Sequence, residues 1–276
     1  MPPTAVSAAP LSATAPRWSG PRWPWWVFLL AVVLVFIKDL PVLLVGIWGG
    51  PDWVSQQAGA LITMGVLLVL ALCAALAVPG RLRADHLGLR RAAPAQIALW
   101  TGVALAAMYG PMLLGNALGQ DASQDVSGML GHGLANDLAL VLAISVVGPV
   151  AEEFAHRAVL LRAAADALAR WLPPRAALAI AMLVSSSLFM VVHVGAPPWQ
   201  MATYFLIALA LSAAYAFTGS LLAPLVPHLL NNAYASVTMA WSSNASLPVL
   251  AVALLSPVLG LALAWAVGKW LGWAKP

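Results

Sequence analysis

The sequence predicts an all-α polytopic membrane protein with about eight transmembrane helices. Of the 276 residues, 62% are hydrophobic and only 8% are charged, which leaves too few charges to cover a water-soluble surface. Apolar windows of the roughly 20 residues needed to cross a bilayer recur along most of the chain. These windows are continuous and do not alternate with polar residues, which argues against a membrane β-barrel.

Each apolar window is expected to form one helix. The windows cover residues 25–49, 55–78, 96–118, 137–168, 176–195, 199–218, 221–241 and 247–272. Lys38, Asp39 and Pro41 interrupt the first window, which predicts a kinked or divided helix there. The fourth window is unusually long and contains Gly148 and Pro149, so a kink is also expected at that pair.

The positive charges between the windows predict the orientation in the membrane. They occur before the first window, between the second and third, between the fourth and fifth, and at the end of the chain: Arg17, Arg22, Arg81, Arg83, Arg90, Arg91, Arg162, Arg170, Arg175, Lys269 and Lys275. The alternate segments 50–54, 119–136, 196–198 and 242–246 contain no Lys or Arg. The positive-inside rule therefore places both termini in the cytoplasm. Topology also explains the net charge of +4, so no nucleic-acid partner is expected.

Several polar side chains fall inside the apolar windows, where an ionisable group costs at least about 2.5–3.5 kcal/mol and therefore indicates a functional site. They are Lys38, Asp39, Glu152, Glu153, His156, Arg157, His193, His228, Asn231 and Asn232. Three of the five histidines of the chain belong to this group.

Helical spacing assigns roles to five of these residues. Glu153 and Arg157 are four residues apart, so they are expected to form a structural ion pair within one helix. Glu152 has no such cationic partner in its helix, which makes it the candidate base that takes a proton from water. His228 and Asn232 share one helical face and can both donate hydrogen bonds to a developing oxyanion.

His193 lies beside a helix break at Pro197 and Pro198. A single buried histidine of this kind is usually satisfied by a neighbouring carbonyl group. Here it accompanies a carboxylate, a second imidazole and an amide on separate helices, and this set can activate water and stabilise a tetrahedral intermediate.

Three motifs on successive windows resemble the CPBP family, which comprises CAAX proteases and bacteriocin-processing enzymes and is also called the Abi family. Residues 152–157 have the form E-E-x-x-x-R, residues 189–193 the form F-x-x-x-H, and residues 228–232 the form H-x-x-x-N. The segment 85–90 is similar to the loop that precedes the family's core. The resemblance extends over about residues 85–241.

The resemblance implies an eight-helix intramembrane endopeptidase related to the type II CAAX prenyl endopeptidases. It implies that Glu152 activates the water with help from His193, and that His228 and Asn232 form the oxyanion site. The chain departs from the family pattern at His156, where an aromatic residue is common, and at Ala158, where Gly is common.

His156 leaves the question of a metal cofactor open. One turn from Glu152, it is expected to be a hydrogen-bond partner of that carboxylate. In the alternative, Glu152, His156, His193 and His228 would ligate zinc or another divalent ion. No cofactor is required by the sequence.

The predicted organisation has four parts. Residues 1–22, rich in Pro, Ala, Ser and Thr, form a disordered tail, 23–84 the N-terminal transmembrane helices, 85–241 the protease core, and 242–276 a C-terminal transmembrane helix. The expected partners are the lipid bilayer and a membrane-associated protein or peptide substrate. The Ala-, Arg- and Trp-rich composition indicates a bacterial cytoplasmic membrane.

Two alternative functions are kept. Buried Glu and His residues also occur in proton-coupled transporters, although this sequence lacks the paired repeats common in carriers. A non-catalytic scaffold or immunity protein of the same family is the other alternative, and the complete set of four costly polar groups argues against it.

Overall fold

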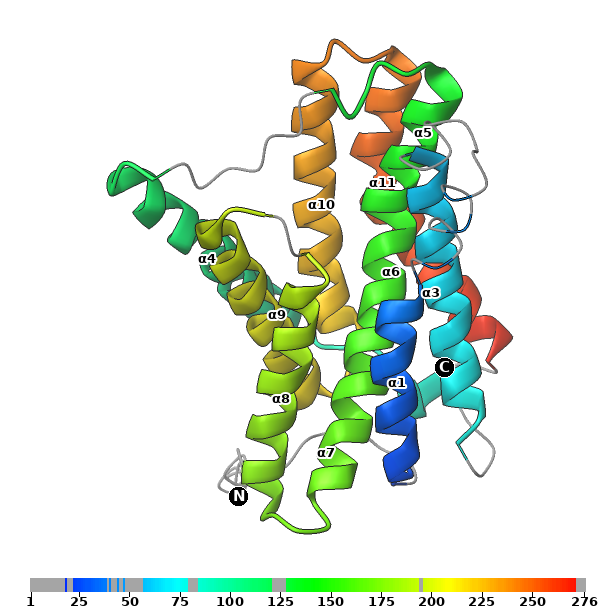
Figure 1. The fold of residues 1–276 in the computed structure, drawn as a ribbon, viewed down its shortest axis with the longest axis vertical. Coiled ribbons are helices and arrows are strands. Elements are labelled where there is room, and N and C mark those ends of the chain that lie inside the picture. Colours follow the sequence, from blue (N-terminus) through cyan, green and yellow to red (C-terminus); the bar gives the residue numbers. More distant parts are fainter. Residues whose placement is uncertain are drawn as a thin grey trace, which may run out of the picture.

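The computed structural model describes residues 22–38, 57–78, 84–120, 128–193 and 196–271, together with residues 18, 40, 44 and 47. All the regular secondary structure in these residues is helical (Figure 1), which confirms the predicted fold class. Besides the long central helix described below, the elements are α1 (Trp25–Ile37), α3 (Gly59–Leu76), η2 (Ala84–Leu87), α4 (Pro94–Ala117), α8 (Pro174–Val191), α9 (Pro198–Thr218), α10 (Leu222–Ser242) and α11 (Leu247–Trp270).

Six of the described helices are long and apolar enough to cross a membrane: α3, α4, the central helix, α8, α9 and α11. Helix α10 has sufficient length but is less apolar, because it carries a histidine, two asparagines and several hydroxyl groups. Helix α1 has 13 described residues. The chain is therefore a polytopic integral membrane protein. The predicted interruption at Asp39 and Pro41 and the expected tail, apart from residues 18 and 22, lie outside the described residues.

The central helix runs without a break from Leu134 to Leu168, through the site of the predicted kink. It consists of α5 (Leu134–Leu142), the π-helical η3 (Ala143–Val147), α6 (Gly148–Glu152), the π-helical η4 (Glu153–Leu161) and α7 (Arg162–Leu168). Helices α1, α3, α8, α10 and α11 pack around it. Long π-helical segments are rare and are often found at functional sites. Here they flank the turn that carries Glu152.

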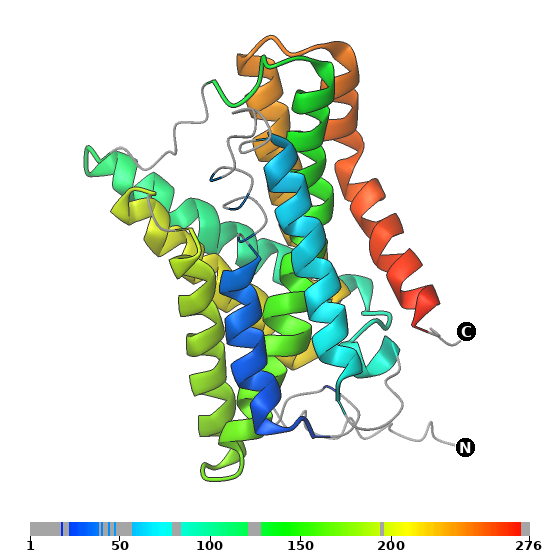
Figure 2. The same ribbon diagram turned by 45° about the vertical axis from the view of Figure 1, so that its right-hand side comes forward.

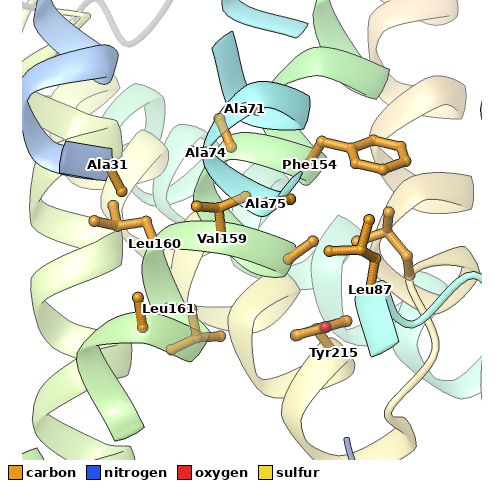
Figure 3. Packing of buried hydrophobic residues seen from close by; sticks show 14 of the residues in the cluster. Ala31, Ala71, Ala74, Ala75, Leu87, Phe154, Val159, Leu160, Leu161 and Tyr215 are labelled. Carbon is orange, nitrogen blue, oxygen red and sulfur yellow. The ribbon is translucent and has the colours of Figure 1, made fainter. Parts of the chain in front are cut away.

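Small side chains bring the neighbouring helices close to the central helix. The alanines of α1 and α3 lie against larger side chains of η4 (Figure 3). The labelled members of this core are Ala31, Ala71, Ala74, Ala75, Leu87, Phe154, Val159, Leu160, Leu161 and Tyr215. In a bilayer, where lipid tails are as apolar as the side chains, such close backbone approach is a main source of helix association.

The segments that carry arginines gather at one end of the bundle. The η2 loop is tied to α7 because Arg162 donates a hydrogen bond from Nη1 to the carbonyl oxygen of His86. It is tied to the end of α9 because Arg90 donates from Nη2 to the carbonyl oxygen of Thr218 at 2.9 Å. The α7–α8 turn lies at this same end, opposite the α10–α11 turn (Figures 1 and 2). The positive-inside rule requires this grouping, and the cytoplasmic location of that end stays a prediction.

Gly88 holds the η2 loop against the α9–α10 turn, and its replacement by Ala is expected to weaken this attachment. Its carbonyl oxygen accepts a hydrogen bond from the backbone of Leu221 at 2.7 Å. Its φ is +76°, and an added Cβ would lie 2.5 Å from the Tyr215 ring. The left-handed conformation alone costs a non-glycine residue about 1–2 kcal/mol. We therefore expect a lower thermal unfolding temperature for Gly88→Ala in detergent. The matched control, Gly102→Ala, adds a Cβ where no atom lies within 4 Å and should not lower it; equal stability of the two variants would contradict this account.

Candidate active site

A cavity of about 450 Å³ lies between the central helix, α3, α4, α8, α9 and α10. Glu152, His193, His228 and Asn232 all line it. The structure thus places the four residues singled out in the sequence around one hollow, although they are separated by up to 80 positions in the chain.

His228 connects the two adjacent glutamates of the central helix. Its Nδ1 lies 2.7 Å from Oε1 of Glu153, and its Nε2 lies 3.6 Å from Oε2 of Glu152. Because a carboxylate can only accept a hydrogen bond, the hydrogen in the shorter contact is on Nδ1. The Nε2 atom, which lies toward Glu152, is then the ring nitrogen left for contact with a molecule in the cavity.

Glu153 and Arg157 form the expected ion pair and are both fully buried. Nη1 of Arg157 lies 3.2 Å from Oε1 of Glu153. The guanidinium group also donates from Nη2 to the carbonyl oxygen of Ala208 in α9, at 3.2 Å, and lies over the ring of Phe189 in α8. The pair therefore joins the central helix to α8 and α9, and it positions the carboxylate that holds His228.

His193 follows the last turn of α8 and is fixed from two sides. Its Nδ1 donates a hydrogen bond to the carbonyl oxygen of Phe189 at 2.7 Å, and its ring stacks on Tyr204 with 4.3 Å between the centroids. With the hydrogen on Nδ1, the neutral ring presents a lone pair on Nε2. This arrangement leaves Nε2 able to accept a hydrogen bond from water.

The residue numbering alone puts His193 and His228 near opposite ends of their helices, so their meeting needs an explanation. The ring of Phe189 provides it. Its centroid lies 4.8 Å from the ring of His193 and 6.1 Å from that of His228. Because α8 ends at Val191, His193 lies beyond the regular helix and beside the same phenyl ring as His228. Both imidazoles thus lie beside one phenyl ring.

Asn232 is anchored by a defect in the central helix. In the π-helical segment η3, Gly148 donates to the carbonyl oxygen of Ala143, five residues earlier. The next carbonyl in this series belongs to Ile144, and its donor would be Pro149, which has no N–H. Asn232 fills this position, donating from Nδ2 to the Ile144 oxygen at 2.8 Å. One N–H of its amide remains for another acceptor.

The comparison with protein families adds independent support. Residues 134–234 match the family described as "Type II CAAX prenyl endopeptidase Rce1-like". The match covers 101 of the 276 residues and supports an assignment to the CPBP/CAAX intramembrane protease family. The matched segment runs from the start of the central helix into α10 and contains every site residue discussed above. The comparisons with curated proteins and with solved structures gave no match.

The side chains of this chain do not fit the metal site considered from the sequence. Among the described residues, no three His, Cys, Asp or Glu side chains are grouped so that they could hold an ion. His156 is buried, its ring meets the Phe189 ring edge-on at 5.2 Å, and its Nδ1 has no hydrogen-bond partner in the described part of the chain. The expected hydrogen bond between His156 and Glu152 is not formed; the His156 ring instead lies against Phe189.

Two contacts between helices of the site could not be found from sequence spacing. Glu153 was expected only to pair with Arg157, yet it also binds His228. Asn231 lines the cavity, donates from Nδ2 to Oδ1 of Asn232 at 3.0 Å, and receives a hydrogen bond from the Tyr109 hydroxyl in α4 at 3.5 Å. Tyr109 lies 122 positions from Asn231, and no motif links them. Contacts between helices so far apart in the sequence have no local signal.

Proposed function

We propose that this CAAX-type protease hydrolyses a peptide bond of a membrane-associated protein or peptide, with Glu152 and His193 activating water and His228 and Asn232 stabilising the oxyanion. The observation that carries the proposal is the common cavity: a carboxylate, an imidazole lone pair and two groups able to donate hydrogen bonds all line it. These are the parts that hydrolysis of an amide requires.

Each step uses one of the observed groups. Glu152 takes a proton from a water molecule that also donates to Nε2 of His193, and the resulting hydroxide attacks the carbonyl carbon of the scissile bond. The carbonyl oxygen, now negative, receives hydrogen bonds from the free N–H of Asn232 and from Nε2 of a protonated His228. The C–N bond then breaks, and the proton held by Glu152 passes to the leaving nitrogen. The products are one new carboxylate and one new amine.

Comparison of membrane-protein termini in cells is the decisive experiment. Cells with the wild-type protease are compared with cells that carry Glu152→Gln. We expect a set of new N-termini to be present only with the wild type, because the amide side chain cannot take a proton from water. Unchanged termini in the Glu152→Gln cells would refute the proposal.

Asp137→Asn supplies the matched control for that comparison. It makes the same carboxyl-to-amide change at a second buried acid of the central helix. Asp137 accepts hydrogen bonds from the backbone of Gly131 and His132 at 3.0 and 3.1 Å, and it does not line the cavity. We expect the wild-type termini in Asp137→Asn cells.

The same experiment separates the alternatives retained from the sequence. A transporter or a non-catalytic scaffold would leave the termini of other proteins unchanged in both variants. The proposed location is the bacterial cytoplasmic membrane, on the basis of composition. The substrates identified by their termini would also show on which side of the membrane the cleaved bonds lie.

A further inference from the structure

A second hollow lies between α8 and α9, on the outside of the bundle. It has a volume of about 410 Å³, and it is separate from the cavity that contains Glu152, since the two share no lining residue. Helix α8 stands at the edge of the bundle in both views (Figures 1 and 2). Of the seven described lining residues, Arg175 is charged and six are apolar, among them Ala179, Met182, Leu183, Leu209 and Phe217. We call this hollow the α8–α9 groove.

The α8–α9 groove follows the helices from the arginine-bearing end of the bundle toward the middle of the membrane. On α8, its lining extends from Arg175 to Leu183, eight residues later, which is about 12 Å of helix. On α9, which returns to the same end, it extends from Leu209 to Phe217, the last residue but one of that helix. One leaflet of the hydrocarbon core is about 15 Å thick. The groove therefore spans most of one leaflet.

The apolar part of the groove needs an apolar occupant. Leu183 and Phe217 are 48% and 37% exposed, and the hydrocarbon core holds no water that could cover them. An empty groove would leave its lining side chains without dispersion contacts. Ala179 lines it with a methyl group only, between the longer side chains of Met182 and Leu183. An acyl chain of the surrounding lipid fits this environment in polarity and in direction.

Arg175 gives one end of the groove a positive charge. Its side chain is exposed and forms no hydrogen bond or ion pair with the described residues. The described acid closest to it along the chain, Asp166, already accepts a hydrogen bond from the backbone of Trp23 at 2.9 Å and interacts with three other arginines. Trp171, 75% exposed in the preceding turn, is of the residue type that marks the headgroup level. Arg175 thus lies where a lipid phosphate can serve as its counter-ion, and guanidinium groups bind phosphate in bidentate fashion.

From these observations we infer that the α8–α9 groove binds one anionic phospholipid, with its phosphate on Arg175 and one acyl chain along Ala179, Met182 and Leu183. A zwitterionic lipid brings a cation of its own next to the guanidinium group, whereas the headgroup of phosphatidylglycerol does not. One basic side chain at the surface is therefore expected to favour the anionic lipid about fivefold. The inference goes beyond the proposed function, because binding at this surface does not depend on hydrolysis at Glu152.

A photoreactive lipid tests both the place and the headgroup. Phosphatidylglycerol with a diazirine in one acyl chain is added to the purified protein in detergent, and the residues that it labels after illumination are identified by mass spectrometry. We expect labelling at Met182 and Leu183. Unlabelled phosphatidylglycerol and phosphatidylcholine with the same acyl chains then compete for the site. Half-maximal competition should need about fivefold less phosphatidylglycerol.

Two pairs of variants separate the contributions of charge and shape. With Arg175→Gln, the two lipids should compete equally, whereas Arg91→Gln, the same change at an exposed arginine that does not line the groove, should keep the fivefold difference. Ala179→Phe fills the groove and should abolish labelling at Met182 and Leu183. Its control, Ala106→Phe, adds the same ring to an exposed alanine of α4 outside the groove and should leave the labelling unchanged.

Several outcomes would overturn the inference. Equal competition by the two lipids in the wild type would show a non-selective lipid contact, and this result requires no variant to fold. A fivefold difference that persists in Arg175→Gln would exclude the assigned phosphate ligand. Labelling that persists in Ala179→Phe would place the lipid outside the groove. Absence of labelling on α8 in the wild type would indicate that a second copy of the chain covers the groove instead of lipid. None of these results changes the test of the proposed function.

Discussion

Replacing Glu153 with Gln is expected to destabilise the protein by about 3–5 kcal/mol, because the change leaves the buried guanidinium group of Arg157 without its counter-charge. Both side chains are fully buried and lie 3.2 Å apart. A marked fall in the unfolding temperature of the purified protein in detergent would show the effect. The same replacement exchanges the charged acceptor of His228 Nδ1 for a neutral amide oxygen, which holds the ring less strongly, so activity should fall as well.

A double replacement separates the two roles of Glu153. With Glu153→Leu and Arg157→Met together, no unpaired charge remains, and exchange of a buried ion pair for apolar side chains of similar size is often neutral. We expect the double variant to regain most of the stability lost by Glu153→Gln but to stay poorly active, because His228 still lacks its partner. A double variant less stable than the single one would contradict the ion-pair argument. Recovery of activity along with stability would show that Glu153 does not position His228.

The second large effect concerns the rate of hydrolysis. Glu152→Gln should lower kcat by roughly 10³-fold or more, and His193→Ala by roughly 10²–10⁴-fold, the range for a positioned acid–base group. Asn232→Ala should cost roughly 10²–10³-fold, as for one oxyanion donor. Initial rates of the purified variants on a substrate identified from its terminus would measure these losses, with Asp137→Asn as the reference.

Non-additivity provides a stricter test of the same assignment. If Glu152 and His193 act on one water molecule, the kcat of the double variant should lie within a few-fold of the kcat of the slower single variant. Losses that multiply would indicate that the two residues act in separate steps, which would contradict the proposed pairing.

The sequence predicts the fold well, because the bilayer imposes strong constraints on composition. Long apolar windows can only be helices in lipid, and the predicted ends of α9, α10 and α11 lie within two residues of the observed ones. At Gly148 and Pro149, where a kink is expected, the helix is continuous and has a π-helical segment on either side of α6. Side-chain donors from a neighbouring helix, such as Asn232, satisfy the freed carbonyl there, and this compensation depends on a contact 88 positions away.

For the site, the sequence identifies the polar side chains that cost free energy to place inside the membrane, but it does not identify how these side chains are oriented. The spacing of Glu153 and Arg157 predicts their ion pair, since both partners belong to one helix. The same rule does not produce a bond between Glu152 and His156, because Glu152 lies toward His228 of α10 and the His156 ring packs against Phe189 of α8. The bond between Glu153 and His228 and the contact of Tyr109 with Asn231 depend on how separate helices pack, which no periodicity within one helix encodes. The roles of Glu152, His193, His228 and Asn232 remain predictions until the variants are measured.

Phe189 has a consequence that extends beyond packing. The phenyl ring of Phe189 contacts the imidazole of His193, assigned to water activation, and lies near that of His228, assigned to charge stabilisation. The guanidinium group of Arg157 lies over the same ring. The positions of His193 and His228 thus both depend on the Phe189 ring. A side chain of another size at position 189 would therefore be expected to shift both imidazoles together.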